Sequence, residues 1–211
     1  AAGGDLNFTA AHIGNWTDGD AAAAGSSGNI LIAAGAVNLS ATDGWSFAKI
    51  GNGDFYAGHS GTLGGNITVN ASSLTLTADA SDTGIGQARI GNLGDGTTTG
   101  NIVINTTGSI SLIAADSGLV NIGGASVRTD TNGNTLQGAG SGDLTILAGG
   151  SVSLLAQTGG EARIESGGFT NGNVSVSATG DVTLAVSSNS SGASNGTAFI
   201  GSYATGNGAV N

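Results

Sequence analysis

One tetrapeptide, Ala-x-Ile-Gly or a close variant of it, recurs six times along this chain of 211 residues. The copies lie at 11–14, 48–51, 88–91, 120–123, 162–165 and 198–201, so their Ile residues are 37, 40, 32, 42 and 36 residues apart. A period of this size is typical of repeat architectures, in which each unit buries its apolar face only against its neighbours.

Two more short patterns lie between consecutive copies of the tetrapeptide. A Gly followed by Asn or Asp and by alternating apolar residues begins at 28, 65, 100, 142 and 172. Another apolar alternation follows at 37–39, 74–76, 110–112, 152–154 and 182–184, and Leu6 and Phe8 look like one more copy. A period of two predicts a strand with one buried face, and no window has the 3.6-residue period of a helix.

Three short strands and their loops in each repeat describe one coil of a β-solenoid. We therefore expect an all-β parallel β-helix of about five to six coils of 32–42 residues, forming one domain over residues 1–211. Parallel coils would stack about 4.8 Å apart. The apolar residues would then form columns, and the clearest core column is Ile13, Ile50, Ile90, Ile122, Ile164 and Ile200.

The composition agrees with such a thin core. Ile, Leu, Val and Phe supply 46 residues, about 22% of the chain, which alone would be close to the range of disordered sequences. A solenoid needs only a few of them in each coil. At its corners, Asn29, Asn66, Asn101 and Asn173 share one register, with Asp143 in the fourth coil, which predicts a ladder of side-chain hydrogen bonds along the stack. The alternative is that they are independent turn residues.

The order of the three patterns resembles that of the filamentous-haemagglutinin-like exoproteins. The clearest copies are FAKIGNGDFYAGHSGTLGGNITVNASSLTLTA at 47–78 and GQARIGNLGDGTTTGNIVINTTGSISLIA at 86–114. The resemblance implies a right-handed parallel β-helix and a secreted surface adhesin of a Gram-negative bacterium, exported by two-partner secretion. Many relatives have His after Ile-Gly, where this chain has Asn15, Asn52 and Asn92.

The second residue of the tetrapeptide is His12, Lys49, Arg89, Asn121, Arg163 and Phe199 in successive copies. Three of the four Lys and Arg residues of the chain share this column, which strand alternation directs away from the core. An outward basic column could contact a carboxylate or sulfated glycan, with candidate contacts His12, Lys49, Arg89 and Arg163. We favour the other interpretation, which is local charge balance with acids in neighbouring loops.

Aromatic residues follow the same strands. Trp16, Tyr56, Phe169 and Tyr203 lie in the loops after the tetrapeptide, where exposed rings could stack on sugars. The alternative is that these rings cap an open corner of each coil.

Several classes of function are disfavoured by the residues available. With 14 acidic and 4 basic residues and a net charge of −10, the chain is a poor partner for nucleic acid or an anionic membrane, and no apolar run is long enough for membrane insertion. There is no Cys, no calcium-binding nonapeptide repeat and no cluster of acid and base residues. We expect no catalytic residue, no metal and no cofactor.

The function expected from these patterns is structural and adhesive. The chain would be a non-catalytic segment of an extracellular rod or filament, extended end-to-end through its open coil ends by further repeats or by copies of itself. The alternative is a module that binds host or biofilm polysaccharide through the basic column and the loop aromatics.

Overall fold

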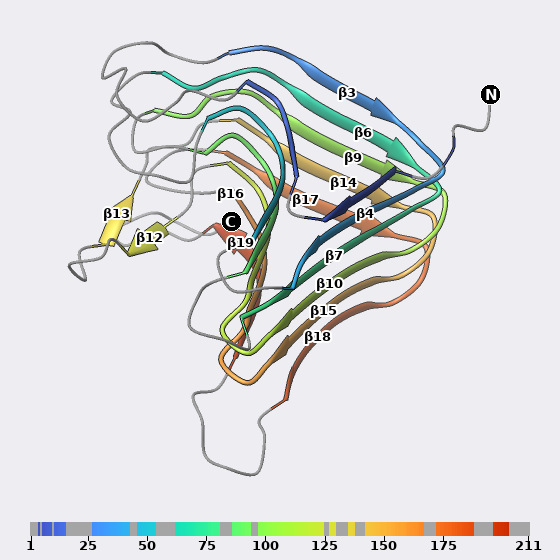
Figure 1. Ribbon diagram of the computed structural model, residues 1–211. Helices are drawn as coiled ribbons and strands as arrows, with labels where there is room; N and C mark the ends of the chain where they lie inside the picture. Colours follow the sequence, from blue (N-terminus) through green and yellow to red (C-terminus); the bar gives the residue numbers. More distant parts are fainter. Residues whose placement is uncertain are drawn as a thin grey trace.

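The computed structural model describes residues 4, 6–9, 11–15, 27–42, 46–53, 62–80, 86–93, 97–124, 127–129, 135–137, 142–166, 172–187 and 196–202. Within these residues the chain is all-β and contains no helix, as the sequence predicts. Seventeen of its strands form three parallel sheets, and the remaining two form a small hairpin. Figure 1 shows the strands of successive coils stacked beside one another.

Each sheet corresponds to one of the three sequence patterns. Sheet I carries the tetrapeptide and consists of β2 (His12–Ile13), β5 (Phe47–Ile50), β8 (Gln87–Ile90), β11 (Leu119–Ile122), β16 (Glu161–Ser166) and β19 (Thr197–Ser202). Sheet II carries the Gly-Asn pattern and consists of β3 (Ile30–Ala33), β6 (Ile67–Ala71), β9 (Ile102–Thr106), β14 (Leu144–Ala148) and β17 (Val174–Ala178). Sheet III carries the third pattern and consists of β1 (Leu6–Thr9), β4 (Ala36–Ala41), β7 (Ser73–Asp79), β10 (Ile110–Ala115), β15 (Val152–Gln157) and β18 (Val182–Ser187).

The chain visits the sheets in the fixed order II, III, I, and each strand pairs in parallel with its counterpart in the next coil. This topology is a parallel β-helix of five complete coils, preceded by β1 and β2, so the predicted fold class is confirmed. Because every strand repeats the alternation of the strand below it, one register serves the whole stack.

The predicted core column exists as a continuous row. Ile13, Ile50, Ile90, Ile122, Ile164 and Ile200 are paired in that order by the strands of sheet I. The four inner members are fully buried, and the two outer ones are partly buried at the ends of the core. Apolar columns from sheets II and III face them, so the core runs along the axis of the solenoid.

One feature departs from the repeat. Between β11 and β14 the chain forms an antiparallel hairpin of β12 (Val127–Thr129) and β13 (Thr135–Gln137), which lies beside the stack in Figure 1. This insertion accounts for the longest interval between tetrapeptides, the 42 residues from Ile122 to Ile164.

Candidate functional site

The second residues of the tetrapeptide form a single column on the outer face of sheet I. Strand pairing connects them in register along the stack in the order His12, Lys49, Arg89, Asn121, Arg163 and Phe199. The sequence therefore predicts correctly that the scarce cations of the repeat lie above one another.

The predicted exposure of this column is wrong. Lys49 is 1% exposed and Arg89 is 4% exposed, and Asn121 between Arg89 and Arg163 is also buried. His12 is half-buried, and the side chain of Arg163 is 13% exposed. Lys49 and Arg89 are therefore not available to a glycan at the surface, and the basic column is an internal feature of the fold.

The cause lies in the residues that follow the strands, since the carbonyl groups of Asn52 and Gly53 lie over the Lys49 ammonium group. Residues that follow the strands, among them Asn52, Leu63 and Leu93, are themselves buried. The strands β5, β8 and β11 consequently have consecutive buried residues on both faces rather than alternating ones. Alternation indicates which side of a strand a residue occupies, but a covering loop decides whether that side meets solvent.

Two members of the column, Lys49 and His12, bond to backbone carbonyls of the turn that follows β5. The Lys49 Nζ donates to the carbonyl oxygens of Asn52 at 3.1 Å and of Gly53 at 2.7 Å. The His12 Nε2 lies 2.7 Å from the carbonyl oxygen of Gly51. These contacts stabilise the turn after β5, since a buried polar group without a hydrogen bond is costly.

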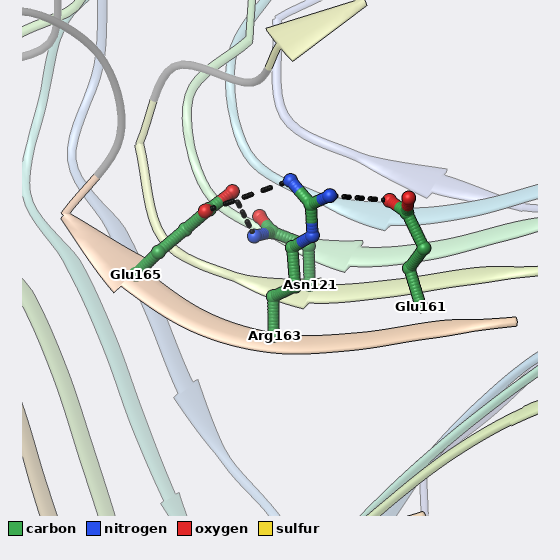
Figure 2. A network of polar contacts seen from close by, with 4 residues as sticks. All are labelled: Asn121, Glu161, Arg163 and Glu165. Atoms are coloured by element: carbon green, nitrogen blue, oxygen red, sulfur yellow. Dashed lines mark hydrogen bonds and ion pairs between the residues drawn. The ribbon is translucent and has the colours of Figure 1, made fainter. Parts of the chain in front are cut away.

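Toward the other end of the column, Arg163 belongs to an ionic cluster, which Figure 2 shows. The Arg163 Nη2 lies 2.7 Å from the Oε2 of Glu161, and its Nη1 lies 3.8 Å from the Oε2 of Glu165. The Asn121 Nδ2, one coil away, donates to the Oε1 of Glu165 at 2.9 Å. The cluster therefore ties the third coil to the fourth.

Glu165 is the buried carboxyl of the cluster. Desolvation raises its pKa above the ordinary value, and nearby Glu161 acts in the same direction. The positive charges of Arg163 and Arg89 and the hydrogen bond from Asn121 lower the pKa, but by less than burial raises it.

The predicted corner ladder is confirmed, with a different hydrogen-bond pattern from a purely amide ladder. The side-chain oxygen of each residue accepts a hydrogen bond from the backbone N–H of its successor, at 2.9 Å in every step. The ladder runs through Asn29, Asn66, Asn101, Asp143 and Asn173. An Asp can replace Asn in it because the shared element is an oxygen acceptor.

A second ladder, not predicted from the sequence, is formed by Asn15, Asn52 and Asn92. The Oδ1 of Asn52 accepts from the Asn15 N–H at 3.1 Å, and the Oδ1 of Asn92 accepts from the Asn52 N–H at 3.0 Å. The Nδ2 of Asn52 donates to the carbonyls of Gly28 and Gly64, which precede the strands of sheet II. This ladder therefore joins the end of sheet I to the beginning of sheet II.

A sequence signal for the second ladder was present. Each of the three Asn residues follows Ile-Gly directly, and their spacing equals that of the Ile residues. The loop aromatics Trp16, Tyr56, Phe169 and Tyr203 lie outside the described residues.

The described residues contain no group of three or more His, Cys, Asp or Glu side chains that could hold a metal ion. They also contain no helix long and apolar enough to cross a membrane. Comparisons with protein-family models, with curated proteins and with solved structures found no match.

Proposed function

We propose that the chain is a structural, non-catalytic segment of an extracellular rod, similar in role to the repeat regions of filamentous-haemagglutinin-like adhesins. In this proposal the solenoid continues beyond its last coil by stacking, either on further coils of a longer polypeptide or on copies of this chain. Its task is to extend or join a filament rather than to transform a substrate.

The observation that carries the proposal is the state of β18 at one end of sheet III. Val182 and Leu184 are each 47% exposed, and Val186 is 50% exposed. Their partners in β15, Val152, Leu154 and Ala156, are fully buried. These side chains belong to the core columns, so β18 presents a core-like row that another coil would cover.

The internal position of the cations supports the same proposal. Lys49 bonds to backbone carbonyls of its own coil, and Arg163 pairs with carboxylates of its own strand. Both side chains therefore make contacts inside the fold rather than at its surface. A polysaccharide-binding role would have to depend on other residues than Lys49 and Arg89.

Sedimentation of the purified chain over a range of concentrations tests the proposal. We expect end-to-end association of the unmodified chain, and loss of it in Leu184→Asp, because a charge would then occupy the row that stacks. Thr183→Asp is the matched control, since Thr183 is the next residue of β18 and is also exposed. The control should associate like the unmodified chain.

The same preparations applied to a glycan array provide the opposing outcome. A chain that stays monomeric at every concentration and binds a glycan tightly would overturn the structural proposal.

A further inference from the structure

Glu165 occupies a position where the neighbouring coils have glycine. It directly follows Ile164, as Gly123 follows Ile122 in the coil before, and it pairs with Gly201 in the coil after. The side chain is not expelled into solvent, because Glu165 is only 2% exposed. This coil therefore holds an ionisable group at a place where the repeat otherwise has none.

The carboxylate of Glu165 is incompletely neutralised by its surroundings. Its Oε1 accepts the hydrogen bond from Asn121, but its Oε2 is buried and has no hydrogen-bond partner. The nearest guanidinium nitrogen, Arg163 Nη1, is 3.8 Å away, because Arg163 makes its short contact of 2.7 Å to Glu161 instead. Glu161 is the more solvated competitor, with a side chain that is 40% exposed.

Among the residues that the structure describes, the charged groups around Glu165 come from two strands. Arg163 and Glu161 lie on β16 itself, and Arg89 lies on β8, while β11 contributes the uncharged Asn121. The two arginines favour the carboxylate, whereas burial and Glu161 favour the protonated form. Burial outweighs the arginines, which agrees with the geometry of the unbonded oxygen.

We propose that Glu161, Arg163, Glu165 and Asn121 form a proton-sensitive joint between the third and fourth coils, which is more stable when Glu165 carries a proton. Protonation removes the buried negative charge while Arg163 keeps its short contact to Glu161. The joint is a property of this one coil, since the other copies of the tetrapeptide end in Gly.

The direction of the pH effect follows from linkage. A carboxyl whose pKa is higher in the folded than in the unfolded state binds more protons when folded, over the interval between the two values. Stability therefore rises as the pH falls through the folded pKa of Glu165, down to the ordinary glutamate value of 4.5. Acids that are paired favourably in a fold give the opposite dependence.

Urea unfolding of the full chain at a series of pH values tests the joint. The difference in midpoint between the unmodified chain and Glu165→Gln isolates the contribution of this group. As the solution is acidified from neutral pH, we expect the urea concentration at the unfolding midpoint of the unmodified chain to rise relative to that of Glu165→Gln. Asp181→Asn, which removes an exposed acid, is the control. Its unfolding midpoint should depend on pH as that of the unmodified chain does.

A residue-specific titration by carbon NMR of the Glu165 carboxyl supports the same test without a variant at Glu165. The midpoint should lie above 4.5. It should fall in Glu161→Gln, because the negative charge of Glu161 would no longer raise the pKa of Glu165 or compete with it for Arg163. A midpoint at or below the ordinary value, or equal pH dependence in the unmodified chain and Glu165→Gln, would overturn the proposal.

Discussion

At the scale of single residues, the polar side chains of this protein act mainly between coils. Asn52 illustrates the principle, because one fully buried amide bonds to the coil on either side of it and to the start of sheet II. Lys49, by contrast, acts within one coil, because its Nζ donates to the carbonyls of the turn after its own strand. Such buried groups stabilise the native register only while their hydrogen bonds are complete.

We expect Asn52→Ala to lower the free energy of unfolding by at least about 2 kcal/mol, because buried carbonyls would lose their donor. Asn38→Ala is the matched control. The Nδ2 of Asn38 donates to the Oδ1 of Asn7 at 2.8 Å, but that contact is exposed on sheet III, so its loss should cost less than about 1 kcal/mol. Equal losses in urea denaturation would show that the second Asn ladder does not stabilise the stack.

At the scale of strands and coils, the close contact of successive coils depends on a row of glycines at the end of sheet I. A Cβ at Gly123 would lie 1.8 Å from the carbonyl oxygen of Glu165. One at Gly91 would lie 1.7 Å from the carbonyl oxygen of Gly123. Real side chains do not approach a carbonyl so closely, so a side chain at Gly91 or Gly123 would force the neighbouring coil to shift.

Gly123→Ala should therefore destabilise the fold by at least about 2 kcal/mol. Its neighbour offers an internal comparison, since a Cβ at Gly124 would meet only the Thr98 Oγ1 at 3.7 Å. Gly124→Ala should change stability by no more than about 0.5 kcal/mol. Thermal unfolding followed by circular dichroism distinguishes the two variants, and a reversed order of stability would contradict the proposed role of the glycine row.

The strands and their register could be predicted because each coil repeats the same alternation at the same positions. Ile50, Ile90 and Ile122 illustrate this, since their spacing alone places them in one column. The burial of Lys49 could not be predicted, because it depends on how the turn at 51–53 folds back over the strand and places the carbonyls of Asn52 and Gly53 on the Lys49 Nζ. The hairpin of β12 and β13 escaped prediction too, although an Asn-Gly pair at 132–133 between its strands is a hairpin signal.

At the scale of the whole molecule, few large apolar residues suffice because those of the core recur at the same strand positions and stack in columns. The core is a narrow row along the axis, and Lys49, the only Lys of the chain, is buried rather than on the surface. Lys49 and Arg89 are thus internal to the fold, as we propose for a structural segment and unlike the cations of a charged binding surface.

Acylation of amines in the native chain tests this claim most directly, because Lys49 is the only lysine and the unfolded chain supplies its reference rate. The rate of modification at Lys49 is measured by mass spectrometry of peptides at one pH. It should be at least about tenfold lower in the native chain than in urea, because the native Lys49 Nζ is buried and hydrogen-bonded and reacts only after local opening. The amino terminus in the same sample controls for the reagent. Modification of Lys49 at similar rates in both states would contradict the internal position of the column.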